Sequence, residues 1–215
     1  MKTLNIPKLD FSACENVLDK IKWLQTHGAK ASINEINWKE DFPYSLPVSV
    51  FVAHDDDNLH VYYTVKSEML RATNTEDFGS VWEDSCVEFF MQREGEKTYR
   101  NFECNALGAL LASKRESRND AEKLLEIMPA ITRFSTIQHR YENEVQVSDW
   151  TLYLEISKEA MGFSPTESLS GSTIKANFYK CGDKTRYPHF QSWNRIDLPS
   201  PDFHVPQFFG TLIFE

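Results

Sequence analysis

The chain has 215 residues, of which 41% are hydrophobic, 26% charged and 13% aromatic, and its formal net charge is −9. This length and composition are typical of one folded domain with a sizeable core. The lysines and arginines are scattered along an acidic chain, which argues against a nucleic-acid partner, because binding a phosphate backbone requires clustered cations.

The N-terminal segment MKTLNIPKLDF contains no apolar run of the length found in signal peptides, and no segment approaches the roughly 18 apolar residues of a membrane span. We therefore expect a cytoplasmic protein with no membrane partner, although the mature form of a secreted or periplasmic protein would look the same. The cysteines form no CxxC pair, so the spacing predicts no structural zinc site; they are Cys14, Cys86, Cys104 and Cys181.

The first 45 residues are mixed in character. Val17, Leu18, Ile21 and Leu24 have helical spacing, and Gly28 follows as a stop signal. We therefore expect residues 1–45 to form an arm with a short helix that packs on the domain.

From residue 46 onward the pattern is that of β-strands separated by turns. The predicted strands are the segments 47–54, 58–66, 85–92, 98–108, 130–141, 147–157, 172–183 and 208–215. One further segment, ESRNDAEKLLEIM (116–128), predicts a second short helix. The whole pattern favours an all-β fold, an antiparallel, jelly-roll-like β-sandwich with one or two short helices, in which residues 46–215 form a single domain.

A carboxylate interrupts the apolar strand VWEDSCVEFF, since Glu88 stands between Val87 and Phe89. Burying an unpaired carboxylate costs several kcal/mol or more, so Glu88 needs either solvent or a partner. Val87, Phe89 and Met91 alternate with it and are predicted to face the core.

The next strand, TYRNFECN, is expected to pair with this one across the turn REGEK. If the turn is symmetric about Gly95, Cys86 lies opposite Cys104, and Glu88 shares a face with Arg100 as its diagonal neighbour. In an exported protein the two cysteines would then be placed for a cross-strand disulfide. One interpretation of the Glu88–Arg100 pair is a purely structural ion pair.

Four segments in order resemble the carbohydrate-binding modules of family 9: VWEDSCVEFF, YRNFECNALG, IKANFYKCGD with PHFQSWN, and DFHVPQFFGTLIFE. The resemblance runs from about residue 45 to the C-terminus. It implies a non-catalytic β-sandwich whose partner is a mono- or oligosaccharide held between two tryptophans, which would be Trp82 and Trp193. Glu88 and Arg100 match residues that bind sugar hydroxyls, with Asn105 and Asn194 as further candidates. Members of the family often bind structural calcium, but no ligands for it can be matched here, so no cofactor is assigned.

Other functions remain open at this point. A glycoside hydrolase needs two carboxyl groups flanking the scissile bond, whereas the expected register puts Glu88 and Glu103 on opposite faces. A haem carrier would need two side chains as axial ligands of the iron, for which Met91 and His189 are the candidates. The cluster HDDDN (54–58) is a candidate for calcium binding, but a solvated turn explains it better. A sandwich that serves only as an interaction domain is the remaining alternative, and the sequence indicates no oligomeric state.

Overall fold

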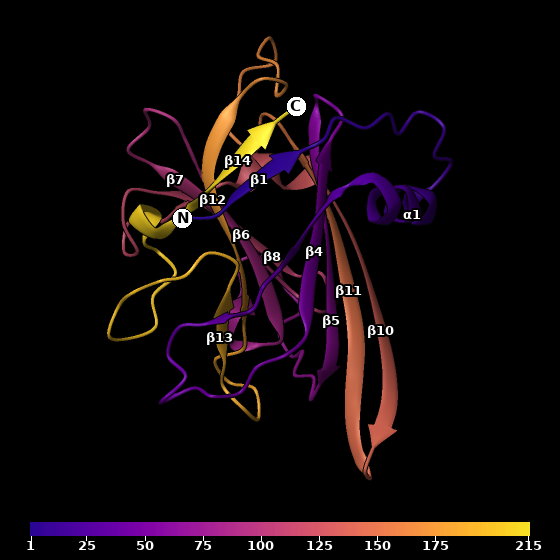
Figure 1. Ribbon diagram of the computed structural model, residues 1–215, viewed down its shortest axis with the longest axis vertical. Coiled ribbons are helices and arrows are strands. Elements are labelled where there is room, and N and C mark those ends of the chain that lie inside the picture. The colour runs from indigo at the N-terminus through magenta and orange to yellow at the C-terminus, as the bar shows by residue number, and fades with distance from the viewer.

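Two β-sheets packed face to face form the body of the protein (Figure 1). The computed structural model describes residues 1–215. The larger sheet contains, in spatial order, β1 (Thr3–Ile6), β14 (Gly210–Phe214), β12 (Thr173–Cys181), β6 (Cys86–Arg93), β7 (Tyr99–Asn105), β8 (Leu110–Arg115) and β9 (Glu122–Lys123). At one end of this sheet β13 (Phe190–Ser192) pairs with β12 and with β3 (Glu35–Ile36). The smaller sheet contains β10 (Ile131–Glu142), β11 (Val145–Ser157), β5 (Asn58–Glu68), β4 (Val48–His54) and β2 (Ala29–Ser32).

The predicted β-sandwich is therefore confirmed, and all of its strand pairs except β1–β14 are antiparallel. The β10–β11 hairpin extends well beyond the rest of the sandwich (Figure 1). No helix has the length and apolar character needed to span a membrane.

The helix predicted near the N-terminus is α1 (Val17–His27). It begins because the Asn16 side chain accepts hydrogen bonds from the backbone N–H groups of Leu18 and Asp19, which otherwise have no partner at a helix start. It ends before Gly28, and it lies beside the smaller sheet, on which it buries Ile21 and Leu24 (Figure 1). Residues 1–45 also supply β1, β2 and β3, so they form part of both sheets as well as the expected helix.

The second predicted helix, over residues 116–128, is wrong. The segment instead forms a turn, the short strand β9 and a 3-10 turn at Leu125–Ala130. The Asp120 carboxylate accepts hydrogen bonds from the N–H groups of Glu116 and Ser117 and so closes a turn where helix would have to form. The pairing of β9 with β8 prevents a regular helix in this segment, and so does Pro129 in the 3-10 turn.

The main core lies between the two sheets. Val87, Phe89 and Met91 on β6 face this core, as the alternation of the sequence predicts. From the smaller sheet it receives the alternate residues of β4, β5 and β11, among them Val50, Val61, Tyr63, Trp150 and Leu152. The inner face of β6 is therefore apolar at Val87, Phe89 and Met91.

The outer face of the larger sheet carries a second apolar cluster. It contains Cys86, Phe90 and Tyr99 from β6 and β7, Tyr179 and Cys181 from β12, and Ile196, Phe203, Val205 and Phe209 from the segment between β13 and β14. The segment 195–209 thus covers an outer face that would otherwise meet solvent. Glu88 belongs to this covered face, since it alternates with Val87 and Phe89 along β6.

The register predicted for β6 and β7 is wrong by one residue. Glu88 lies opposite Glu103 instead of Phe102, and Cys86 lies opposite Asn105 instead of Cys104. Because Met91 pairs with Arg100, the centre of the hairpin lies between Gly95 and Glu96 and not at Gly95. Because a shift of one residue exchanges the two faces of a strand, Arg100 and Cys104 lie on the face opposite to Glu88 and Cys86. The Cys86–Cys104 disulfide considered for an exported protein is therefore excluded by geometry.

Candidate functional site

A cavity of about 260 Å3 opens on the outer face of the larger sheet. Its floor is made by side chains of adjacent strands, namely Glu88 on β6, Glu103 on β7 and Cys181 on β12. Aromatic rings of Trp82, Phe190 and Phe203 form walls, and the polar residues around them are Arg115, Arg118, Asn119, Asp183, Asp202 and His204. The cavity therefore combines flat apolar surfaces with several charged groups.

Two carboxyl groups lie side by side on the floor of this cavity. Glu88 is 3% exposed and Glu103 is 4% exposed, and the two residues are direct cross-strand neighbours. Burial, together with the charge of Glu103, raises the pKa of Glu88 well above its usual value. Burial also raises the pKa of Glu103 to about 7, although Arg115 and Asn101 oppose that shift. A proton shared by such a pair relieves the repulsion between its two carboxylates.

The two glutamates differ in their protein partners. Glu103 Oε1 accepts a hydrogen bond of 2.9 Å from Asn101 Nδ2, and Asn101 Oδ1 accepts one of 2.9 Å from Arg115 Nε. Glu88 Oε1 accepts only from the Cys181 thiol, at 3.0 Å. Neither carboxylate forms an ion pair with an arginine or lysine, so Glu88, whose donor is a thiol and not an amide, is the less compensated of the two.

The wall that contains Trp82 is fixed to the loop after β12. The backbone N–H of Asp183 donates to the Trp82 carbonyl at 3.1 Å, and that of Lys184 donates to the Glu83 carbonyl at 3.0 Å. These bonds hold the 3-10 turn Val81–Glu83 beside the start of the loop. Burial raises the pKa of Asp183 to about 6, so its side chain is a weak acid at the edge of the cavity.

The opposite wall comes from the segment that covers the sheet. His204 Nδ1 and the Tyr99 hydroxyl are 2.9 Å apart, and Phe203 stacks on Tyr179 with ring centroids 4.1 Å apart. Burial and the charges of Arg115 and Arg118 lower the pKa of His204 to about 3. The neutral imidazole therefore contributes no positive charge to the cavity at neutral pH.

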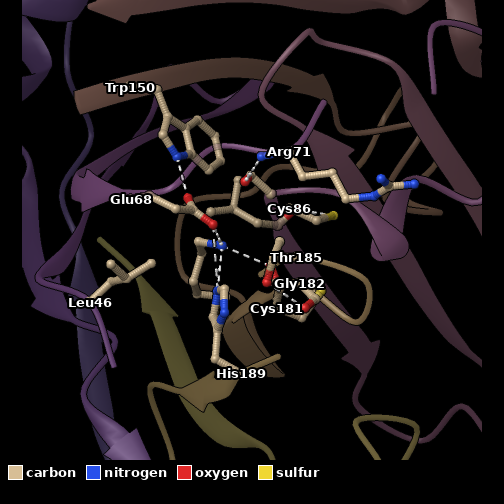
Figure 2. Close-up of polar contacts among 12 residues, drawn as sticks. Leu46, Glu68, Arg71, Cys86, Trp150, Cys181, Gly182, Thr185 and His189 are labelled. Atoms are coloured by element: carbon tan, nitrogen blue, oxygen red, sulfur yellow. Dashed lines mark hydrogen bonds and ion pairs between the residues drawn. The ribbon is translucent and has the colours of Figure 1, made fainter. Parts of the chain in front are cut away.

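A buried ion pair beneath the site joins the two sheets (Figure 2). Lys180 Nζ on β12 is 2.8 Å from Glu68 Oε1 on β5, and both side chains are at most 1% exposed. Lys180 also donates to the Cys181 carbonyl and to His189 Nε2, both at 2.7 Å, while Trp150 Nε1 donates to Glu68 Oε2 at 2.6 Å. Each buried charge thus has several partners, and the network fixes the end of β12 next to the cavity.

Of the six residues predicted for sugar binding, Trp82 and Glu88 line the cavity. Arg100 does not, because its guanidinium packs on Gly162 and lies 3.4 Å from Glu96 on the other side of the sheet. Gly162 has a φ of 89°, which favours glycine, and a Cβ there would displace the guanidinium, from which it would lie 2.3 Å.

The other three predicted residues have structural contacts instead. Trp193 is 4% exposed and packs in the main core against Phe178 and Gly210, where an added Cβ would lie 2.5 Å from its ring. Asn105 uses its amide to bind the Asp84 carboxylate and the loop around it. Asn194 accepts from the Lys2 N–H and donates to the Phe208 carbonyl. A clamp between Trp82 and Trp193 is therefore not formed.

The sequence matches the family model described as carbohydrate-binding family 9 over residues 15–214. A crystal structure from Bacteroides uniformis ATCC 8492, described as "a putative carbohydrate-binding protein", has 37% sequence identity and a TM-score of 0.89, covering 100% of this chain and 99% of that chain. The chain belongs to carbohydrate-binding family 9. No curated protein matches it.

Two more distant structures share the fold of this family 9 domain. Both are family 9 modules from Caldicellulosiruptor kristjanssonii, one in complex with cellotriose and one with glucose. The first has 10% identity and a TM-score of 0.60 over 100% of this chain and 94% of that chain. The second has 11% identity and a TM-score of 0.56 over 100% and 96%.

The acidic cluster at residues 54–58 does not fit calcium in this family 9 domain. Asp55 accepts from the Asn58 N–H and lies 3.0 Å from His60, whereas Asp57 binds Lys158. Asp56 accepts from the backbone N–H groups of residues 169 and 170. The three carboxylates therefore have separate partners and do not converge on a shared position.

The candidate axial ligands of a haem are also separated. Met91 lies in the core between the sheets. His189 is fully buried, and its Nδ1 lies 2.8 Å from the Tyr187 carbonyl while its Nε2 contacts Lys180. Both ring nitrogens of this histidine are therefore engaged by the protein.

The sequence reasoning missed most of the cavity. Glu103 could have been predicted from the hairpin. An even number of residues between the paired positions, instead of the odd number that symmetry about Gly95 implies, places Glu103 opposite Glu88. The remaining residues come from strand ends and loops far apart in sequence, namely Arg115 at the end of β8, Phe190 at the start of β13, and Arg118, Asp183, Phe203 and His204 in loops. No local pattern indicates that these loops meet.

Proposed function

We propose that this domain binds a sugar, without catalysis, in the cavity above Glu88 and Glu103. The observation that carries the proposal is the presence of aromatic walls, two carboxyl groups on the floor and two arginines in one cavity. A pyranose has apolar C–H faces and a rim of hydroxyl groups, and such a set of side chains complements both features.

Each kind of side chain has a distinct role in this proposal. Trp82 and Phe203 cover the faces of the sugar ring. Glu88 and Glu103 accept hydrogen bonds from hydroxyl groups, and Arg115 donates to hydroxyl oxygens. Arg115 is preoriented for this role, because its Nε and one terminal nitrogen are already bound to Asn101 Oδ1 and to the Arg118 carbonyl.

The size of the cavity favours a single sugar ring as the unit recognised. Its volume of about 260 Å3 lies just below the range of sites for drug-sized ligands, about 300–1,000 Å3. The family 9 modules in complex with glucose and cellotriose support a sugar as the ligand class.

The same geometry supports binding over hydrolysis. Glu88 and Glu103 lie on the same face, contrary to the register expected from the sequence, but both sit on the floor of the cavity as direct cross-strand neighbours. A glycosidase places its two carboxyl groups on either side of the scissile bond. Two carboxyl groups beneath one side of a ring instead suit hydrogen bonding to hydroxyls.

The test is a titration of the purified protein with a panel of mono- and oligosaccharides, followed by tryptophan fluorescence and calorimetry. Trp82 lines the cavity, whereas Trp38, Trp150 and Trp193 are buried, so a bound sugar should change mainly the emission of Trp82. We expect a saturable change with one sugar class, and no release of new reducing ends on incubation with oligosaccharides. Absence of a saturable signal in both methods for every sugar would refute the proposal.

A further inference from the structure

Two cysteines and a glutamate meet at the floor of the cavity. Cys86 on β6 lies directly opposite Cys181 on β12, and Glu88 follows two residues after Cys86 on the same face. One ligand atom from each residue lies within 4.8 Å of the other two, and Cys181 Sγ is 3.0 Å from Glu88 Oε1. All three side chains are buried (Figure 2 shows both cysteines).

We propose that Cys86, Cys181 and Glu88 bind a thiophilic divalent metal ion of the zinc class. Zinc prefers tetrahedral sets of sulfur, nitrogen and carboxylate oxygen, with Zn–S bonds of about 2.3 Å and Zn–O bonds of about 2.0–2.2 Å. A tetrahedron of this size separates two sulfur ligands by about 3.8 Å, which is compatible with the spacing of the cluster. Three protein ligands leave a fourth position, and Glu88 and Cys181 line the cavity, so this position faces the ligand space.

The charge balance around Glu88 supports a bound cation. The carboxylate is buried beside a second glutamate and has only a thiol as its protein partner. The nearest lysine, Lys180, is already engaged by Glu68, His189 and the Cys181 carbonyl. A buried carboxylate without a cationic partner is costly, and a metal ion bound to one of its oxygens would give Glu88 that partner, while the two thiolates keep the net charge of the cluster the same as that of the ionised carboxylate with two thiols.

The binding step balances in protons and charge. The metal ion replaces the protons of the two thiols, and of Glu88 where it is protonated, and these protons pass to solvent. No oxidant or reductant is required.

A disulfide between Cys86 and Cys181 is the competing outcome for the same pair. We favour the metal because oxidation would remove the thiol proton that Cys181 donates to Glu88 and would leave the buried carboxylate with no donor. Metal binding instead gives all three side chains a common partner.

The experiment is a cobalt titration of the full chain, reduced and stripped of metal with a chelator. We expect a thiolate-to-cobalt charge-transfer band that saturates at one equivalent and is displaced by zinc. The band should be lost in Cys86→Ser and Cys181→Ser and retained in Cys14→Ser, whose residue lies in the N-terminal segment outside the cluster. Glu88→Gln keeps both sulfur atoms and should weaken cobalt affinity at least tenfold.

Three results would overturn the proposal: no thiolate band, a band that persists in both Cys86→Ser and Cys181→Ser, or unchanged affinity in Glu88→Gln. Thiol counting under denaturing conditions before reduction identifies the disulfide alternative, which is established if the 86- and 181-containing peptides are linked and the reduced protein binds no cobalt. Circular dichroism confirms that each variant is folded. The titration needs no sugar, so its outcome is independent of the proposed sugar binding.

Discussion

Glu88 on β6 and Glu103 on β7 lie directly opposite each other on the covered outer face of the larger sheet. Like charges at such positions destabilise a sheet, so the pair is retained at a cost in stability. Because both glutamates lie on the floor of the cavity, we connect this loss of stability to ligand binding.

The substitution Glu103→Gln should weaken sugar binding without lowering the stability of the fold. We expect the affinity for the sugar to fall about tenfold to a hundredfold, because a hydrogen bond to a charged group contributes about 1.5–3 kcal/mol. Thermal stability should stay equal or rise, since the repulsion between the carboxylates is removed. Calorimetry and thermal unfolding measure the two effects, with the exposed Glu126→Gln as the matched control. An unchanged sugar affinity would argue against a role of Glu103 in binding.

The two tryptophans first expected to act together should respond differently to alanine substitution. Trp82→Ala should abolish the fluorescence response and weaken sugar binding, because Trp82 lines the cavity. Trp193→Ala should lower the free energy of unfolding by about 3–5 kcal/mol, because the ring is buried in the main core. Urea unfolding and calorimetry on both variants test this. The interpretation fails if Trp193→Ala is fully stable and loses sugar binding.

Removing only one partner of the ion pair between Lys180 and Glu68 should destabilise the protein. Lys180→Met leaves the Glu68 carboxylate buried without a cation, and we expect a loss of about 3–5 kcal/mol in the free energy of unfolding. The double variant Lys180→Met/Glu68→Leu removes both charges and should recover much of that loss. Urea unfolding of the two single variants and the double variant measures the coupling. Additive effects of the two substitutions would contradict it.

His189 should make the protein less stable in mild acid. Burial and the charge of Lys180 lower its pKa to about 2, from an ordinary value of 6.5. Between these values the unfolded chain binds a proton that the folded protein does not, so stability falls as the pH is lowered below about 6.5. The contribution of this one residue has a slope of about 1.4 kcal/mol per pH unit.

His189→Gln tests this pH dependence, because glutamine cannot titrate and keeps an acceptor for Lys180. We expect the free energy of unfolding of the variant to depend less steeply on pH between 4 and 6. The difference in slope from the parent should be about 1.4 kcal/mol per pH unit, the contribution of one histidine. Urea unfolding at a series of pH values gives both slopes. Parallel slopes for the parent and the variant would show that His189 is protonated in the folded state as well.

The sequence alone was sufficient for the inner face of the sandwich and for the strands β4, β5, β6, β7, β10, β11, β12 and β14, but it did not indicate β1, β2, β8, β9 or β13. Alternation places Val87, Phe89 and Met91 in the core, and helical spacing with Gly28 as a stop predicts α1. These features depend on neighbours one to four residues apart, so a local pattern encodes them. The anomaly at Glu88 likewise pointed to a residue that lines the cavity.

Only the tertiary structure decided how the site is assembled. The β6–β7 hairpin is centred between Gly95 and Glu96 instead of at Gly95, and this register brings Glu103, in place of Arg100, to Glu88. The contacts of Trp193 with Phe178 and Gly210 bury a ring that the family resemblance assigned to sugar binding. The segment 195–209 folds over the outer face and supplies Phe203 and His204. These outcomes depend on contacts between segments distant in sequence, where the burial of one side chain is decided by what the rest of the chain packs against it.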